Sequence, residues 1–250
     1  MSILNSKKNS DDENKKNGCL TLPPLITGIL LKRYKRFLAD VRLDTGDVVI
    51  AHCPNSGSMK ECAQPGRPVY LSRSNNPKRK LAYTWELIQM PGSLVGVNTL
   101  LPNRLVHTAI SDGRIESLGG YSKIKREVNV GNHSRIDLML SGGNARPCYV
   151  EVKNSTWVVE GVARFPDAVT VRGQKHMAAL QALSQQGFRA VVFFLIQRMD
   201  ARVFMPADQL DPAYAAALRQ AMEAGVEVMA YDVDLTLEEI GLRRPVPVRI

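Results

Sequence analysis

Cysteine is scarce in this sequence of 250 residues, and its four cysteines form no pattern typical of a metal site or a disulfide framework. No Cys-x-x-Cys pair occurs, and no histidine stands at zinc-ligand spacing from any of them. Cys148 lies in an apolar run, so we expect it to be a small core residue. The sequence therefore argues against structural zinc and against a disulfide-stapled fold.

Long hydrophobic runs are also absent. The longest is Ala190–Ile196, far short of the roughly 20 apolar residues that cross a bilayer. Met1–Leu4 gives way at once to a polar stretch, without the apolar segment of a signal peptide. We therefore expect a protein that makes no membrane contact and lies in the reducing cytoplasm.

Acidic residues are fewer than basic ones, 24 against 33, which leaves a net charge of +9. The surplus is uneven: residues 21–110 hold 12 basic and 5 acidic residues (+7), whereas residues 111–250 hold 17 and 16 (+1). Mild basicity is common, but a positive field concentrated on one part of a chain attracts polyanions. The asymmetry indicates a nucleic-acid partner, and the charge does not distinguish DNA from RNA.

The first hundred residues predict a tail followed by a small barrel. Residues 1–20 are mostly polar, and we expect a disordered tail there. Residues 21–99 contain short strand patterns and no convincing helix, which favours an OB-like small β-barrel for nucleic-acid binding. The expected strands are Leu25–Leu31, Arg36–Leu43, Val48–Cys53, Pro68–Ser72, Ser93–Val97 and an alternating one with Leu81, Tyr83, Trp85 and Leu87 on one face.

From about residue 100 to residue 250 the pattern becomes mixed α and β. Pro102 begins a helix whose apolar face contains Leu105, Val106, Ala109 and Ile110. Three alternating strands follow around Ile124–Val130, Ile136–Leu140 and Cys148–Val152. The remaining expected elements are a helix from Val171 to Gly187, a buried strand Arg189–Ile196, a helix from Asp211-Pro212 to Gly225, and a last strand Val226–Tyr231.

The strongest chemical signal is Asp137, followed fourteen residues later by Glu151-Val152-Lys153. Side chains alternate along a strand, so Glu151 and Lys153 project together, and Asp137 lies opposite Ile136 and its neighbour Leu138. If the two strands pair, two carboxylates and an ammonium meet on one surface. An ion pair on a solvated sheet face would explain Glu-x-Lys alone, but not Asp137 at the right spacing and on the right face.

This group of side chains fits metal-dependent phosphodiester hydrolysis. Carboxylate oxygens suit Mg²⁺ or Mn²⁺, which keep several waters and bridge to phosphate oxygens. Such a cation neutralises developing charge and lowers the pKa of a bound water. The lysine can position that water or stabilise the transition state. We therefore predict Asp137 and Glu151 as metal ligands, with Lys153 assisting catalysis.

The order of elements, with an acid on the second strand and Glu-x-Lys on the third, resembles the PD-(D/E)XK nuclease superfamily. More narrowly, the chain after Leu20 resembles the sugar fermentation stimulation protein A (SfsA) family. The matching stretches are 33–40 (RYKRFLAD), 52–55 (HCPN), 78–80 (KRK), 97–99 (VNT), 134–137 (SRID), 149–153 (YVEVK), 165–170 (FPDAVT) and 172–176 (RGQKH). The resemblance implies an OB-like domain, a PD-(D/E)XK nuclease-like mixed-sheet domain, non-specific DNA binding and a loose association with sugar (maltose) metabolism.

Three polar residues near this motif have open roles. Glu127, on the polar face of the preceding strand, fits a third acid or a partner for Lys125 or Arg126, and the sequence does not decide between them. Gln174 resembles the helical glutamine that supports such nuclease sites, so we include it among the catalytic candidates. His176 follows Gln174 by two residues and is therefore within a turn of the proposed site, but we do not assign it a catalytic role. The superfamily name places proline before the first acid, where this chain has Ile136.

Two basic clusters are the candidate nucleic-acid contacts, because burying so much like charge would be prohibitive. The first contains Lys32, Arg33, Lys35 and Arg36, and the second contains Lys78, Arg79 and Lys80. Trp85 is expected in the core, and Phe37 fits either the core or a base-stacking role. Two functions remain: a Mg²⁺-dependent nuclease, or a catalytically silent DNA-binding regulatory factor.

Overall fold

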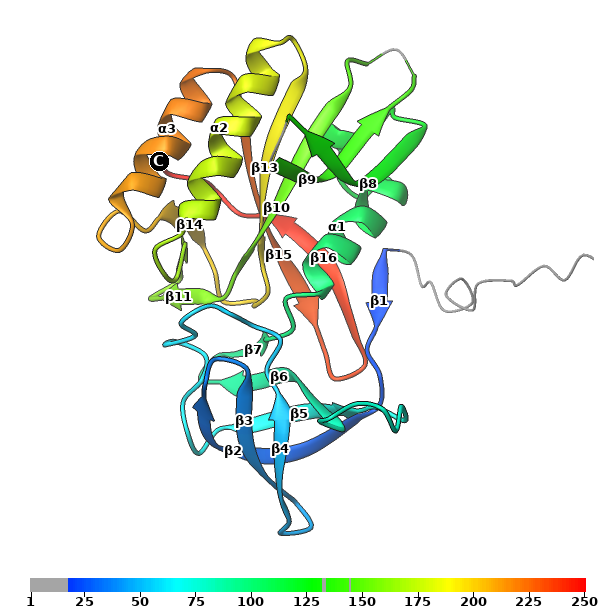
Figure 1. Ribbon diagram of the computed structural model, residues 1–250, viewed down its shortest axis with the longest axis vertical. Helices are drawn as coiled ribbons and strands as arrows, with labels where there is room; N and C mark the ends of the chain where they lie inside the picture. The colour runs from blue at the N-terminus through cyan, green and yellow to red at the C-terminus, as the bar shows by residue number, and fades with distance from the viewer. Residues whose placement is uncertain (1–17, 132–133, 144) are drawn as a thin grey trace, which may run out of the picture.

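The structure is a computed structural model that describes residues 18–131, 134–143 and 145–250. Figure 1 shows two parts: a barrel of strands near the N-terminus, and a larger domain with helices on both faces of a sheet. No helix within these described ranges is long and apolar enough to cross a membrane.

The barrel begins with the first long strand of the chain. Its strands are β2 (Leu25–Tyr34), β3 (Leu38–Leu43), β4 (Val48–His52), β5 (Pro68–Arg73) and β6 (Tyr83–Met90), with β7 (Ser93–Gly96) beside β6. Neighbours are antiparallel in the order β4-β3-β2-β5-β6-β7, and a parallel pairing between β4 and β6 closes the ring. Closure removes the exposed sheet edges. The expected OB-like barrel is confirmed.

Strand β6 departs from the simple alternation that the sequence predicts. Trp85 is fully buried in the barrel core, as expected, and its Nε1–H donates to the Leu87 carbonyl at 2.9 Å. The pairing between β5 and β6 shifts after Trp85, so Ile88 also points into the barrel while Leu87 packs against the second domain. The prediction that Trp85 and Leu87 share a face is therefore wrong, because an irregularity in the ladder rotates the strand between them.

The second domain contains a seven-stranded sheet in the order β1-β16-β15-β13-β10-β9-β8. These strands are β1 (Cys19–Thr21), β8 (Lys123–Val130), β9 (Ser134–Ser141), β10 (Cys148–Ser155), β13 (Arg189–Ile196), β15 (Glu227–Leu235) and β16 (Glu239–Pro245). β13 is parallel to both β10 and β15, and the other pairings are antiparallel. A smaller sheet contains β11 (Trp157–Val159), β12 (Val162–Phe165) and β14 (Val203–Pro206).

Three α-helices cover this sheet, α1 (Leu101–Ser111) on one face and α2 (Val171–Gln185) with α3 (Pro212–Glu223) on the other (Figure 1). Their ends follow the predicted signals. The Asp211 side chain caps α3 by accepting the Tyr214 N–H at 2.9 Å. Gly187 and Gly225 follow α2 and α3 with φ of 87° and 91°, in the left-handed region that ends helices. All three predicted helices are confirmed.

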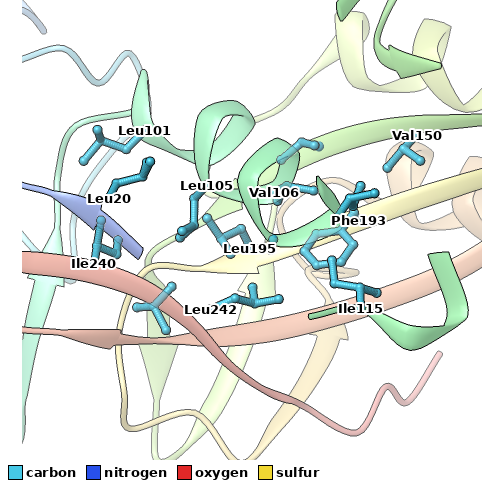
Figure 2. Close-up of a cluster of buried hydrophobic side chains, with 14 of the residues drawn as sticks. Leu20, Leu101, Leu105, Val106, Ile115, Val150, Phe193, Leu195, Ile240 and Leu242 are labelled. Carbon is cyan, nitrogen blue, oxygen red and sulfur yellow. The ribbon is translucent and has the colours of Figure 1, made fainter. Parts of the chain in front are cut away.

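A shared hydrophobic core fixes the barrel against the second domain. Figure 2 shows Leu105 and Val106 of α1 packed near Phe193 and Leu195 of β13. Leu87 of the barrel belongs to this same buried cluster. Because apolar surface from both parts is buried together, their relative orientation is set by packing rather than by a flexible linker.

Two strands of the sheet were not anticipated. We expected residues 1–20 to form a tail, and residues 1–17 lie outside the described residues. Cys19–Thr21 instead form β1, antiparallel to β16. We also expected the chain's last strand to be Val226–Tyr231, but β15 continues to Leu235 and β16 follows it. A three-residue strand whose partner is at the far end of the chain leaves no local pattern.

Candidate active site

Glu151 and Lys153 project from the same side of β10, as strand alternation predicts. The Lys153 Nζ lies 2.6 Å from the Glu151 Oε1, and their side chains are only 11% and 3% exposed. An ion pair so deeply buried is not the solvated surface pair that would explain the Glu-x-Lys motif without any function. Burial makes each charge depend on its partner, because water cannot replace the lost contact.

The sheet is irregular at Asp137. The predicted common face of Ile136 and Leu138 is wrong: Ile136 packs on the α2 side and Leu138 on the α1 side. Across the pair, Glu127 has a φ of +56° and interrupts β8 in the same way, so Ile124 and Val128 also lie on opposite faces. The register of the β8–β9 pair is the same on both sides of this point, so the change of face arises from the backbone conformation at Glu127 and not from an inserted residue.

The Asp137 carboxylate takes over the missing backbone contact. Pairing between β9 and β10 stops at Leu138 and Val150, and the Asp137 Oδ2 accepts the Val152 N–H at 2.8 Å. The Oδ1 accepts the Asn103 side-chain amide of α1 at 2.7 Å. Burial, followed by the nearby negative charge of Glu151, raises the pKa of Asp137 to about 6. Asp137 is therefore protonated more readily than an ordinary aspartate.

Glu151 has one oxygen that the described residues leave unsatisfied. Its Oε1 contacts Lys153 and His176, whereas no hydrogen-bond partner for Oε2 occurs among them, although that atom is buried. Burial acts to raise the pKa of Glu151, but the His176 hydrogen bond and the Lys153 charge outweigh it and lower the pKa. The carboxylate is therefore ionised with free lone pairs, which fits a divalent cation at this position.

His176 of α2 completes the contacts of Glu151. Its Nδ1 contacts the Glu151 Oε1 and lies 3.2 Å from the Lys153 Nζ, while the Arg172 Nε donates to its Nε2 at 3.4 Å. Because the ionised Glu151 carboxylate can only accept, the His176 Nδ1–H donates to it. We expected Gln174 of the same helix to support the site. Its amide instead lies 3.5 Å from the Asp211 Oδ1, so the expected contact is made by His176 and the role of Gln174 stays a prediction.

A weak signal for His176 was present in the sequence. The buried face of α2 contains Gly173, His176, Met177 and Leu180 at helical spacing. A histidine in an apolar stripe is more often structural than functional, and nothing local reveals that the stripe faces Glu151. Among the residues that the structure describes, no three acidic, histidine or cysteine side chains gather in a ready-made metal cluster. A cation here would need water or phosphate oxygens beside the protein carboxylates.

The basic candidates differ in their surroundings. Arg33 uses its guanidinium on backbone carbonyls, donating to those of Arg36, Asn55, Gly57 and Ser58 at 2.8–3.1 Å. Four of its five N–H groups are thereby engaged, so Arg33 mainly holds a loop.

The other basic candidates remain closer to solvent. Lys35, Arg36, Lys78 and Lys80 are exposed, and Arg79 donates to the Thr84 hydroxyl at 3.0 Å. Glu127, the possible third acid, pairs with Arg135 at 2.8 Å rather than with Lys125 or Arg126, and its side chain is 49% exposed.

A closed OB barrel, followed by a mixed α/β domain with acids and a lysine on adjacent strands, defines a two-domain protein whose second domain has a nuclease-like fold. Comparison with known families agrees. Residues 31–97 match the SfsA N-terminal OB domain, and residues 100–239 match the sugar fermentation stimulation protein RE domain. The chain belongs to the SfsA family.

Relatives match over nearly their full length. Sugar fermentation stimulation protein homologs from Geobacter sulfurreducens and Pelobacter propionicus are 56% and 54% identical over 90% and 92% of this chain and 96% and 99% of theirs. The solved structure of Pyrococcus furiosus SfsA in complex with Ca²⁺ is 30% identical, with a TM-score of 0.84 over 92% of this chain and 98% of that chain.

Proposed function

We propose that the protein binds DNA with little regard to sequence and hydrolyses its phosphodiester bonds with the help of Mg²⁺ or Mn²⁺. One observation carries this proposal: the buried, unsatisfied Oε2 of an ionised Glu151 beside Asp137 and Lys153. A purely structural ion pair gains nothing from a second oxygen left without a partner. An oxygen-seeking cation would satisfy that atom and counter the burial and the Glu151 charge that together raise the pKa of Asp137.

Asp137 and Glu151 would hold the cation, which when bound supplies charge neutralisation at the phosphate and a more acidic water. Lys153 places an ammonium where it can stabilise negative charge that develops on the phosphate. His176 and Asn103 orient the two carboxylates by hydrogen bonds. The Ca²⁺ in the Pyrococcus furiosus relative is a cation of the same oxygen-preferring kind, which supports a divalent metal here.

The DNA-binding part of the proposal rests on charge. Residues 21–110 carry the +7 surplus, and the exposed cations of the barrel include Lys35, Arg36, Lys78 and Lys80. Contacts from lysine and arginine to phosphates carry no sequence information and weaken as salt rises. We therefore expect salt-sensitive, sequence-tolerant binding by a cytoplasmic protein.

Cleavage by the purified protein tests the enzymatic part. Labelled single- and double-stranded DNA and RNA are incubated with and without Mg²⁺ or Mn²⁺, using wild type and Glu151→Gln. We expect metal-dependent cleavage by wild type and none by Glu151→Gln, with the variant's folding checked by thermal melting. Equal cleavage by both proteins would reveal a contaminant and contradict the assignment.

The alternative is a catalytically silent DNA-binding regulatory factor, and the same assay identifies it. Such a factor would bind DNA but leave every substrate intact with either metal. Its link to sugar metabolism comes from the family's name, and no side chain in the site explains it.

A further inference from the structure

A polar cleft of about 380 Å³ separates the barrel from the nuclease-like domain. The barrel contributes Arg36 and the loop Asn55–Gly57, and the other domain contributes Asn154–Thr156 and the segment Arg164–Thr170. Ser155 of the cleft follows Lys153 by two residues on β10 and so projects from the same side of the strand as Glu151 and Lys153. Its volume lies within the roughly 300–1,000 Å³ of ligand pockets.

The hairpin that reaches this cleft has an unusual turn. Lys35 and Arg36 connect β2 to β3 with φ of 48° and 63°. Phe37 completes this three-residue connection, because β2 ends at Tyr34 and β3 begins at Leu38. Turn residues with positive φ are usually glycine or asparagine, because the Cβ of most other residues clashes with the backbone there. Here both positions are long cations, both are exposed, and Phe37 follows them with 46% of its surface exposed. Strain retained at such a position points to a use for the side chains.

The turn is held rigidly at the cleft. Arg33 donates to the carbonyls of Arg36, Asn55 and Gly57, which ties the turn to the neighbouring loop. Asp167 of the second domain then accepts the Met59 N–H at 3.1 Å. These contacts fix both walls of the cleft before any ligand arrives, which reduces the ordering cost of binding.

The charge of the cleft favours an anion. Arg36 and Arg164 line it against a single acid, Asp167, whose Oδ2 is used on the Met59 N–H. Arg164 has no ion pair within the part of the chain that the structure describes, and nearby Asp208 pairs instead with Arg219 at 2.7 Å. Two guanidinium groups that make no ion pair among the described residues, with the exposed ring of Phe37 next to Arg36 at the edge of the turn, form a combination that binds phosphates and a stacked base.

The size of the cleft selects among nucleic acids. Its volume of about 380 Å³ is that of a pocket for one small ligand. A duplex is thicker than its major groove, which is about 12 Å wide, and is too bulky to be enclosed in a cleft of this volume. An unpaired strand can enter, because one backbone and one base face fill such a space.

We propose that this cleft binds a single strand of DNA, with Arg36 and Arg164 on its phosphates and Phe37 against a base, and leads the strand to Glu151 and Lys153. This inference rests on the proposed nuclease function and specifies its substrate. The strand end or unpaired segment, rather than intact duplex, is then the form that reaches the active site.

Binding measured in EDTA tests the cleft without requiring catalysis. Fluorescence anisotropy with a labelled oligo-dT, a blunt duplex of equal length and an oligo-U compares wild type, Lys35→Asn/Arg36→Gly and Arg164→Gln. The matched control is Lys123→Gln/Lys125→Gln, which removes two exposed charges from β8, outside the residues that line the cleft. Thermal melting is recorded for each protein.

The turn variant, Lys35→Asn/Arg36→Gly, should gain stability and lose affinity for single-stranded DNA. It should melt at a higher temperature than wild type, because asparagine and glycine suit the left-handed turn, yet it should lose about tenfold or more in oligo-dT affinity. Its plot of log affinity against log salt should flatten by about 0.7, as should that of Arg164→Gln, because each variant loses one of the two proposed phosphate contacts and one contact contributes about 0.7 to the slope. The control should stay within about twofold of wild type.

Oligo-dT affinity of the turn variant equal to the control would overturn the proposal, as would tighter binding of the duplex than of oligo-dT. Tighter binding of oligo-U than of oligo-dT would overturn its assignment to DNA. These outcomes are independent of the nuclease proposal, whose failure would appear as absent metal-dependent cleavage while single-strand binding in EDTA remained.

Discussion

Asp137 accepts the backbone N–H of Val152 through its Oδ2 at 2.8 Å, so a side chain takes the place that a carbonyl of the neighbouring strand would normally hold. The ladder between β9 and β10 ends immediately before this contact. The carboxylate is thereby fixed next to Glu151 by the backbone itself rather than by a flexible side-chain partner. A metal ligand positioned in this way needs little reorganisation when the cation binds.

Removing the Asp137 charge should abolish metal binding. Titration calorimetry with Mn²⁺ should show one weak site in wild type and none in Asp137→Asn, because few protein carboxylates contribute and each is needed. Glu127→Gln is the matched control: Glu127 faces Asp137 across the β8–β9 pair but is ion-paired with Arg135. If Glu127→Gln also loses the site, Glu127 is the third acid, and unchanged binding in Asp137→Asn would exclude the carboxylate as a ligand.

The raised pKa of Asp137 predicts how stability depends on pH in EDTA. A folded pKa of about 6, against about 3.9 in the unfolded chain, means that the folded state holds the extra proton between these values. Its contribution to the free energy of unfolding is therefore full below about pH 4 and is lost as the pH rises through about 6. Carboxylates whose pKa is lowered on folding make the free energy of unfolding rise with pH instead. The contribution of Asp137 is therefore isolated by subtracting the free energy of unfolding of Asp137→Asn from that of wild type, each measured by urea denaturation across this range. A difference that does not change with pH would contradict the raised pKa.

Local signals in the sequence were sufficient for the elements around the site. Pro102 at the start of α1, the Asp211 cap of α3 and the glycines after α2 and α3 each act within one turn of their helix. Strand alternation was enough to place Glu151 and Lys153 side by side. These features depend on short-range chemistry, which a single sequence contains.

Contacts between segments that are distant in the sequence could not be predicted from such local signals. Alternation placed Ile136 and Leu138 on one face, but they pack on opposite faces of the sheet, opposite the point where Glu127 has a positive φ. The burial of His176 against Glu151 depends on how α2 packs on β10. Arg33 stands within a basic cluster in the sequence, and only the folded loop shows that its N–H groups are already used.

Arg33 should therefore act on stability more than on DNA binding. Arg33→Gln leaves the carbonyls of Asn55 and Gly57 without their donor, and we expect a loss of about 1–3 kcal/mol in the free energy of unfolding. Affinity for DNA should fall only slightly, and the salt dependence should keep its slope, because the contact was not to phosphate. Lys78→Gln is the comparison, with stability unchanged and a flatter salt slope. A flattened slope in Arg33→Gln at unchanged stability would return Arg33 to the DNA-binding residues.

Lys153 separates an enzyme from a binding protein. In a catalytic site its ammonium acts chiefly on the transition state, so Lys153→Ala should lose about two to three orders of magnitude in cleavage rate while DNA affinity in EDTA stays within about twofold. The change also removes a buried partner of Glu151, so a lower melting temperature is expected and is recorded alongside.

If Lys153 merely balances Glu151 in a DNA-binding surface, the substitution should weaken DNA binding modestly and leave any trace cleavage unchanged. A contaminating nuclease would also survive the mutation, which makes the variant its own purity control. Equal cleavage by wild type and Lys153→Ala would therefore count against the enzyme and leave a DNA-binding factor on a nuclease-like fold.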